Sequence, residues 1–314
     1  MKNILIIKHG ALGDVVLSMN AIFSIYHHFN KTNITVLTDS KYAEIFKKIP
    51  FIKNIKIDNR PSYFFFLDHF KLIYWFYNNK FDWVFDLQTS KRTNIYFFIF
   101  SLFKKFNWSG IAKKCSHPHL ANNRKKLHTI DRQKEQLKLA GINKFVQPNW
   151  SFLNLNFSKF KKNKPYAIIV PGGSKHRLNK RWNFAYFLEI IKFLDNLDLK
   201  IFLIGGKDEN TILRDSKINY DSVINLIGKT SLNEIAALAK GAQVILGNDT
   251  GPMHLLVVNS SKKALKIVLF GSGSNPNLCS PRGENVLIVK KNNINDIKPN
   301  FIKKIINKKN YSKK

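Results

Sequence analysis

The sequence contains few of the features that mark a secreted, membrane-spanning or disulfide-bonded protein. Its two cysteines, Cys115 and Cys279, stand far apart without metal-ligand spacing, so we expect free thiols in a reducing cytoplasm. The longest apolar run, Ile95 to Phe103, has nine residues, whereas crossing a bilayer takes ~20. The first expected strand begins at Asn3 without a charged lead-in, which predicts no signal peptide. Together these features predict a cytoplasmic location.

Motifs for metal chemistry and for the best-known nucleotide sites are also missing. The sequence has no D-x-D pair and no cluster of His, Cys or carboxylates at metal-ligand spacing, so we expect no metal and no cofactor. It also lacks the P-loop spacing and a G-x-G-x-x-G after the first strand, which disfavours P-loop and classical dinucleotide binding. No Ser/His/Asp or Cys/His arrangement for nucleophilic catalysis is identifiable.

Acidic residues are scarce. The chain has 20 Asp and Glu against 52 Lys and Arg, and its formal net charge is +32. Such a charge favours polyanionic partners: nucleic acid, an anionic membrane or a phosphorylated substrate. The excess is mostly lysine in a sequence also rich in Asn, Ile and Phe, which A/T-rich coding would produce by itself. Without a helix-turn-helix, RRM or zinc signature, a basic nucleic-acid-binding protein is the weaker alternative.

Strands and helices alternate in two successive series. Apolar strands such as 34–38 and 166–170 alternate with helices such as 15–29 and 184–194, which is typical of parallel sheets covered on both faces. Residues 147–165 lose this periodicity and end in a Lys/Asn/Pro cluster, the composition of a linker. The sequence therefore predicts an α/β protein with two Rossmann-like domains, 1–155 and 156–314. The basic C-terminal tail could pack back on the first domain.

A glycine loop follows the strand at 166–170. Gly172 and Gly173 allow backbone N–H groups to approach an anion, and Lys180 and Arg181 add positive charge nearby. This pattern predicts a phosphate site at the carboxyl end of a strand, where open α/β sheets bind ligands. The alternative is an ordinary glycine turn with solvated lysines.

The segment GNDTGPMH, residues 247–254, carries a second anion-binding pattern. Thr250 and Gly251 lead into a helix that Pro252 is suited to begin, and a helix start offers free N–H groups to a diphosphate. Asp249 would repel a phosphate and instead suits the hydroxyls of a sugar. The alternative is that Asp249 or Asn248 only caps the helix.

The segment LIGGKDE places two further acids after a strand and a glycine pair. Asp208 or Glu209 could hold ribose hydroxyls, as acids do in other nucleotide-binding sheets. The alternative for both is a solvated loop acid. With two phosphate-type loops in the same half, a nucleotide diphosphate is the favoured ligand.

One carboxylate, Asp14, lies where the first strand passes into the first helix, in the segment GALGD. It could act as a general base, or it could cap a helix beginning at Val15. The residues alone leave the two roles open.

These motifs in this order resemble glycosyltransferase family 9, the ADP-heptose:lipopolysaccharide heptosyltransferases. The resemblance rests on IIKHGALGDVVLSMNAI, FDLQTSKRT, PGGSKHRLNKRWNFAYFLEII, LIGGKDE, LIGKTSLNEIAALAKGAQVILGNDTGPMHL and VLFGSGSNP, and it covers nearly the whole chain. The chain differs at Asn183, where the family usually has proline, and in the very aromatic stretch SYFFFLDHFKLIYWFY.

The resemblance implies the GT-B architecture, in which two Rossmann-like domains face each other across a cleft. It implies inverting, metal-independent transfer of a heptose from ADP-heptose to a lipid-linked acceptor in lipopolysaccharide core synthesis. The first domain would bind the acceptor and the second the nucleotide sugar. Carried over by position, Asp14 would be the catalytic base, Lys180 the phosphate-binding lysine and Asp249 the acid on the donor sugar. The other expected substrate-binding residues are Gly13, Gly172, Gly173, Ser174, Asp208 or Glu209, Thr250, Gly251 and His254.

Two further expectations concern partners. The segment KRTNIYFFIFSLFKKF combines basic and apolar residues and could rest on the anionic inner face of the inner membrane, where a lipid acceptor would wait. A buried helix with solvated ends is the alternative. The sequence does not separate ADP-heptose from other nucleotide sugars, so a glycosyltransferase of the same fold with another donor or surface glycan remains an alternative.

Overall fold

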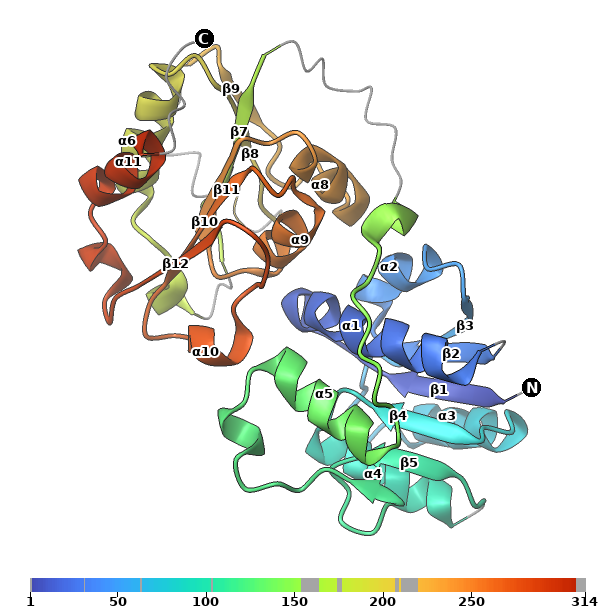
Figure 1. Cartoon of the computed structure of the whole chain (residues 1–314). Coiled ribbons are helices and arrows are strands. Elements are labelled where there is room, and N and C mark those ends of the chain that lie inside the picture. Colours follow the sequence, from blue (N-terminus) through green and yellow to red (C-terminus); the bar gives the residue numbers. More distant parts are fainter. Residues whose placement is uncertain are drawn as a thin grey trace. The chain divides into compact units, whose positions relative to one another are not determined.

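The computed structural model describes residues 2–30, 32–62, 64–102, 104–153, 164–173, 177–206, 209 and 220–308. The chain divides into two compact units, Met1–Phe152 and Leu153–Lys314. In each unit, helices cover both faces of a parallel sheet (Figure 1). The sequence placed the boundary after residue 155, and the functions it assigned to the two parts stay predictions.

The first unit is built on a parallel sheet in the order β3-β2-β1-β4-β5-β6. Its central strand β1 (Asn3–Ile7) pairs with β2 on one side and β4 on the other. The Ile-rich side chains of β1 are buried on both faces, as parallel strands between two helical layers require. The other strands are β2 (Asn33–Thr38), β3 (Ile52–Ile57), β4 (Trp83–Asp86), β5 (Asn107–Gly110) and β6 (His117–Pro118).

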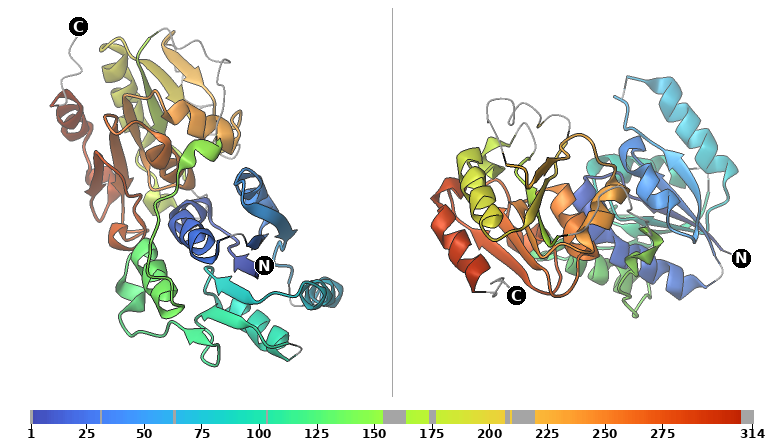
Figure 2. Two further views of the ribbon diagram at one scale, coloured as in Figure 1. Left: turned by 45° about the vertical axis from the view of Figure 1, so that its right-hand side comes forward. Right: turned by 90° about the horizontal axis from the view of Figure 1, so that it is seen from above.

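Two helix pairs cover this sheet. The helices α1 and α5 contact each other, whereas α3 and α4 enclose an apolar cluster with β1 and β4 that includes Phe76, Phe100 and Trp108. Figure 2 shows these helices from two further sides. The bounds are α1 (Leu12–Phe29), α2 (Ala43–Lys47), α3 (Phe66–Asn78), α4 (Lys91–Ser101) and α5 (Thr129–Leu139).

The first helix begins earlier than the sequence predicted. It starts at Leu12 instead of Val15, because the Val15 N–H already bonds to the Ala11 carbonyl and closes the first turn. Ala11 is the N-cap residue and has no side-chain cap. The alternative role of Asp14 as the helix cap is therefore wrong.

The second unit repeats this plan. Its parallel sheet has the order β12-β11-β10-β7-β8-β9. Counted within the unit, the fourth strand again lies beside the first, as in the 3-2-1-4-5-6 order of a Rossmann sheet. The strands are β7 (Tyr166–Val170), β8 (Lys200–Leu203), β9 (Val223–Asn225), β10 (Val244–Asn248), β11 (Leu265–Phe270) and β12 (Val286–Lys290).

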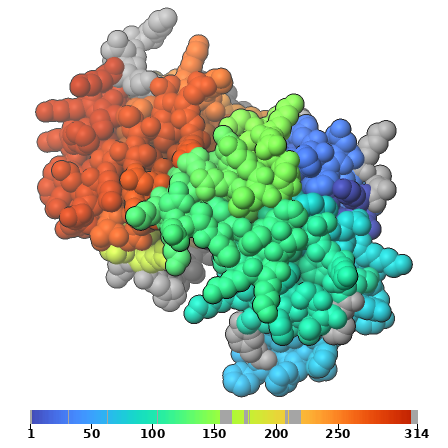
Figure 3. Space-filling view, turned by 60° about the horizontal axis from the view of Figure 1, so that its bottom comes forward, coloured from blue at the N-terminus to red at the C-terminus, as the bar shows by residue number. Residues whose placement is uncertain are grey.

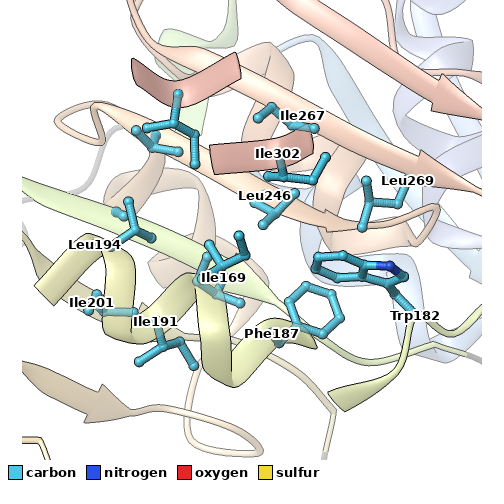
Figure 4. Packing of buried hydrophobic residues seen from close by; sticks show 14 of the residues in the cluster. Ile169, Trp182, Phe187, Ile191, Leu194, Ile201, Leu246, Ile267, Leu269 and Ile302 are labelled. Carbon is cyan, nitrogen blue, oxygen red and sulfur yellow. The ribbon is translucent and has the colours of Figure 1, made fainter. Parts of the chain in front are cut away.

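The core of the second unit lies between the sheet and the α6–α11 pair. Trp182 and Phe187 meet edge to face, with ring centroids 4.9 Å apart, and pack near aliphatic side chains from the strands (Figure 4). The helices α8 and α9 contact each other. The bounds are α6 (Phe184–Asp195), α8 (Leu232–Ala239), α9 (Gly251–Asn259), α10 (Pro276–Cys279) and α11 (Pro299–Asn307).

Candidate active site

The strand order places a ligand-binding edge in each unit. Open α/β sheets bind ligands beside the carboxyl ends of the two strands where the order reverses. These strands are β1 and β4 in the first unit and β7 and β10 in the second. They lead into residues 8–14 and 87–90 in one unit and into residues 171–173 and 249–251 in the other. These segments contain the predicted site residues Gly13, Asp14, Gly172, Gly173, Asp249, Thr250 and Gly251.

In the second unit, the buried Asn248 holds the loops together. Its Nδ2 donates to the carbonyls of Pro171 (2.8 Å) and Gly172 (3.1 Å), and its Oδ1 accepts from the Trp182 N–H at 3.1 Å. These three bonds tie the end of β10 to the glycine loop and to the segment before α6. Sequence reasoning considered Asn248 only as a helix cap, and this role is wrong because Thr250 is the N-cap residue of α9.

Asp249 lies at the centre of a polar cluster in the second unit. Its Oδ2 accepts from the Lys180 ammonium at 2.7 Å and from the Ser274 hydroxyl at 2.6 Å, and His254 Nε2 lies 3.7 Å from Oδ1. Burial alone would raise the pKa of Asp249, but hydrogen bonding to His254, Lys180 and Ser274 lowers it to about 2. Asp249 is therefore a buried carboxylate that stays ionised, and it does not cap α9.

The N-terminus of α9 lies beside this cluster. Thr250 precedes Gly251, the first residue of the helix, and it provides no side-chain cap. Among the described residues, none hydrogen-bonds the buried Oγ1 of Thr250. The first turn of a helix also has N–H groups without intrahelical partners. The hydroxyl and these amides are suitable donors for an anion.

The glycine loop can hold an anion, because it holds a carboxylate. The Gly173 N–H donates to Glu209 Oε1 at 2.7 Å, and the Gly206 N–H donates to Oε2 at 3.0 Å. A Cβ added at Gly172 would lie 1.8 Å from the Glu209 carboxyl carbon, so the absent side chain makes this close approach feasible. The predicted residues Ser174 and Asp208 lie outside the described residues.

The loop after β11 packs on the segment that carries Lys180. A Cβ at Gly271 would lie 2.2 Å from the Asn179 carbonyl oxygen, and one at Gly273 would lie 2.7 Å from Lys180 Cγ. These glycines let the loop bring Ser274 to Asp249. The structure thus brings together Gly172, Gly173, Lys180, Glu209, Asp249, Thr250, Gly251 and His254 within the second unit.

In the first unit, Asp14 lies in the first turn of α1 and is partly buried. The turn before it requires Gly10, whose φ is +148° and whose added Cβ would lie 2.3 Å from the Tyr42 ring. The predicted Gly13 lies beside Asp14 in the same helical turn. Within the described residues, no group hydrogen-bonds the Asp14 carboxylate, whereas the Ser18 hydroxyl bonds to the Asp14 main-chain carbonyl. The carboxylate is therefore not committed to a structural bond.

The charge of Asp14 acts on two cations, the buried Lys8 and the partly buried Arg132, and sequence reasoning missed both. Burial lowers the pKa of Lys8 and of Arg132, while the negative charge of Asp14 raises each of them. Lys8 donates to the Leu87 carbonyl at 3.4 Å, and Arg132 donates to the Thr129 hydroxyl at 3.2 Å. Lys8 could have been suspected, because a lysine ending a buried strand is unusual. Arg132 carries no such signal.

The Asp86-Leu87-Gln88 segment at the end of β4 supports this turn. Asp86 Oδ1 accepts from the N–H groups of Gln88 (3.0 Å) and Thr89 (2.8 Å), and the Gln88 side chain accepts from the His9 N–H. Burial raises the pKa of Asp86 to about 6, against the effect of these hydrogen bonds. The segment therefore positions the backbone that leads to Asp14.

His9 is fixed from its other side by a buried network. His9 Nε2 and the Tyr96 hydroxyl each lie 2.7 Å from Asp58 Oδ2. Burial alone would raise the pKa of Asp58. The hydrogen bond and the charge of His9, together with hydrogen bonds from the Tyr96 hydroxyl and the Arg60 N–H, lower this pKa to about 2. In the part of the chain that the structure describes, no group of three His, Cys, Asp or Glu residues could hold a metal ion.

A family model matches most of the chain. The family model described as glycosyltransferase family 9 (heptosyltransferase) matches residues 71–309. Lipooligosaccharide heptosyltransferase 2 of Haemophilus ducreyi is 21% identical over 310 residues, covering 91% of this chain and 88% of that protein. A protein of the same name from Campylobacter jejuni serotype O:6 is 24% identical over 264 residues, with 83% and 78% covered.

Solved structures share the fold. The Escherichia coli ADP-heptose lipopolysaccharide heptosyltransferase II superposes with a TM-score of 0.76 at 18% identity, covering 98% of both chains. E. coli heptosyltransferase WaaC with ADP gives a TM-score of 0.77 at 17% identity and covers 98% of this chain and 99% of its own. At this identity the likeness establishes the fold, and the predicted α/β class with GT-B architecture is confirmed.

Proposed function

The chain belongs to glycosyltransferase family 9, the heptosyltransferases, and from that premise we propose that it transfers a heptose from ADP-heptose to a lipid-linked oligosaccharide in lipopolysaccharide core synthesis. The relatives named for this activity and the WaaC structure with bound ADP support the proposal. The proposed reaction inverts the anomeric carbon and needs no metal ion.

The observation that carries the proposal is the cluster around Asp249 in the second unit. An ionised, buried carboxylate lies with Lys180 at the end of β10, next to the N-terminus of α9 and the amides of the glycine loop. A nucleotide sugar has the matching parts: a diphosphate for the cations and amides, and hydroxyls for a carboxylate. We assign Asp249 and His254 to the donor sugar, and Lys180, Gly172, Gly173, Thr250 and Gly251 to the diphosphate.

The remaining residues of the donor site follow from the same assignment. Glu209 occupies a nest of two backbone N–H groups, and we assign it to the ribose hydroxyls. Asp208 and Ser174 keep their predicted substrate-binding roles as proposals.

We assign the acceptor chemistry to Asp14. In the proposed step, an acceptor hydroxyl oxygen forms a bond to the anomeric carbon while the bond from that carbon to the diphosphate oxygen breaks. Asp14 takes the hydroxyl proton, and ADP leaves with the electron pair. The logic is that of the base carboxylate in inverting glycosidases, with a sugar hydroxyl in place of water. Gly13 lies beside Asp14 and would contact the acceptor.

Charge on the departing diphosphate must be stabilised without a metal. We propose that the Lys180 ammonium and the first N–H groups of α9 stabilise this negative charge. The nearby Arg181 guanidinium donates to the Gly173 carbonyl at 2.5 Å, so it shapes the glycine loop.

The acceptor is proposed to be lipid-linked, so we propose that the protein works in the cytoplasm, peripherally on the inner face of the inner membrane. Among the described residues, no helix has the length and apolar character needed to cross a bilayer. Contact with anionic lipid would therefore be made from one side, through exposed basic and apolar residues.

A donor screen tests the proposal. We expect isothermal titration calorimetry in the presence of EDTA to detect binding of ADP-heptose and weaker or no binding of UDP- and GDP-sugars. Tighter binding of another nucleotide sugar would show that the chain uses a donor other than ADP-heptose. Binding of DNA without any response to nucleotides would contradict the proposal and favour a nucleic-acid-binding protein.

A further inference from the structure

The helix α3 has two apolar faces, although a surface helix normally has one. One face contributes Leu72 and Phe76 to the core of the first unit, where they are 7% and 2% exposed. Five more large apolar or aromatic residues of the same helix face solvent. They are Phe66, Leu67, Phe70, Tyr74 and Tyr77, with exposed fractions between 51% and 75%.

The second face is a continuous stripe. Leu67, Phe70, Tyr74 and Tyr77 are spaced three or four residues apart, so they project from one side of the helix. Phe64 and Phe65, immediately before the helix, extend the stripe with exposed fractions of 84% and 60%. We call these seven residues, Phe64–Leu67, Phe70, Tyr74 and Tyr77, the α3 surface. Its light-blue side chains project at the lower edge of Figure 3.

The neighbouring helix α4 carries exposed apolar residues as well. Phe76 of α3 stacks on Phe100 of α4 with ring centroids 3.8 Å apart, which fixes the two helices together. On α4 and just after it, Phe98 and Leu102 are 63% and 66% exposed. Exposed apolar residues normally occur singly on a soluble protein, so a group of this size indicates a binding surface.

Positive charge borders the α3 surface. Lys104 Nζ lies 5.1 Å from the centroid of the Tyr77 ring and donates to the Tyr77 carbonyl. Lys71 lies within α3 and Lys105 directly follows Lys104, and both side chains are exposed. The only acid within α3 is Asp68, whose carboxylate lies 4.0 Å from the Lys71 ammonium.

We propose that the α3 surface docks on an anionic lipid bilayer. An aromatic and aliphatic stripe bordered by lysines matches the boundary between acyl chains and anionic headgroups. A helix of 13 residues is about 20 Å long at a rise of ~1.5 Å per residue, too short to span a bilayer, so it lies in the interface plane. A second copy of the chain is disfavoured as the occupant, because both copies carry a net charge of +32.

This inference specifies which surface makes the membrane contact that the proposed function includes. It rests on the proposed function, because a lipid-linked acceptor is the reason for the contact. It moves the main contact from residues 91–106, which the sequence indicated, to α3. The test below needs neither donor nor acceptor, so its failure is distinguishable from failure of the proposed transfer.

The test is flotation of the full chain with vesicles of phosphatidylcholine containing one quarter phosphatidylglycerol. We expect the wild type to float with these vesicles, and less with pure phosphatidylcholine. The double variant Phe70→Glu/Tyr74→Glu should bind more than about tenfold more weakly, because two aromatic side chains leave the interface and two negative charges replace them. Both residues are exposed, so the fold should persist, and an unchanged circular dichroism melt checks this.

The matched control is Leu139→Glu/Phe301→Glu, which makes the same charge change at two helical residues that are 54% and 52% exposed. It should float like the wild type. Equal binding by the α3 variant and the wild type would overturn the proposal, as would a wild type that does not float. A lipid-free dimer that the α3 variant abolishes in analytical ultracentrifugation would also overturn it, by making this face an interface between copies.

Discussion

A single lysine, Lys180, supplies the positive charge that touches Asp249. Replacing it with methionine keeps the side chain at a similar length and removes the ammonium group. We predict that Lys180→Met weakens ADP-heptose binding by ~10–100-fold, since a hydrogen bond to a charged group contributes ~1.5–3 kcal/mol. Isothermal titration calorimetry measures this.

The control for Lys180 is Lys262→Met, which removes a lysine from an exposed pair with Glu284 in the same unit. Donor affinity should not change in the control. If both variants bind donor like the wild type, Lys180 has no role in the diphosphate site.

Asp58 gives a prediction about pH and stability. Its pKa is lowered from 3.8 to about 2 in the folded chain, so ionised Asp58 stabilises the fold above pH 3.8 and this contribution is lost as the pH falls toward 2. The difference corresponds to about 2 kcal/mol. Asp58→Asn should therefore lower the free energy of unfolding by about 2 kcal/mol at neutral pH.

The difference between wild type and Asp58→Asn should shrink as the pH falls below 3.8, because wild-type Asp58 then takes up a proton. Urea unfolding monitored by the signal of the first unit measures it. Asp68→Asn serves as the control, since that side chain is 54% exposed. If the free energy of unfolding of Asp58→Asn were lower than that of the wild type by the same amount at every pH, the stabilisation would not come from ionised Asp58.

Individual site residues could be predicted from the sequence where they lie in a recognisable motif. Asp14, Lys180 and Asp249 each follow a strand in a recognisable segment, and Lys180 and Asp249 meet in the second unit. Arg132 could not be predicted as a neighbour of Asp14, because only the folded chain brings α5 beside α1. The role of Asn248 was also missed, since its three bonds join segments far apart in the sequence.

Among the elements, the glycine loop after β7 offers a direct test. Gly172 lies outside the left-handed region, so alanine fits its backbone, but the added Cβ would meet the Glu209 carboxyl group. We predict that Gly172→Ala displaces Glu209 and lowers donor affinity by more than about tenfold, since the loop amides no longer approach an anion closely.

Gly206→Ala is the matched control for the loop, because nothing lies within 4 Å of its added Cβ. Calorimetry with ADP-heptose should give wild-type affinity for this variant. Undiminished affinity in Gly172→Ala would show that the donor does not approach this loop.

The elements that the sequence predicted best have sharp boundary signals. Gly141, a glycine just after α5, has a φ of +81°, and Ser231 caps α8 in a capping box with Glu234. The start of α1 was placed too late, because Ala11 gives no capping signal. The helix α3 was not predicted, since apolar residues on two faces hide the periodicity of a surface helix.

At the scale of the whole molecule, two Rossmann-like units carry complementary chemistry. The first presents an uncommitted carboxylate at the carboxyl edge of its sheet, and the second presents cations, amides and an ionised acid at the equivalent edge. The alternation of strands and helices was sufficient to predict this plan, because parallel sheets require covered faces. The proposed heptose transfer depends on Asp14 acting as the base.

The most direct measurement is the rate of heptose transfer by Asp14→Asn, with donor affinity determined for the same variant. Asparagine cannot accept the hydroxyl proton, so turnover should fall by ~10²–10⁴-fold while the affinity for ADP-heptose stays close to that of the wild type. Glu44→Gln removes an exposed first-turn acid from α2 and should leave both quantities unchanged. Turnover by Asp14→Asn at the wild-type rate would contradict the account.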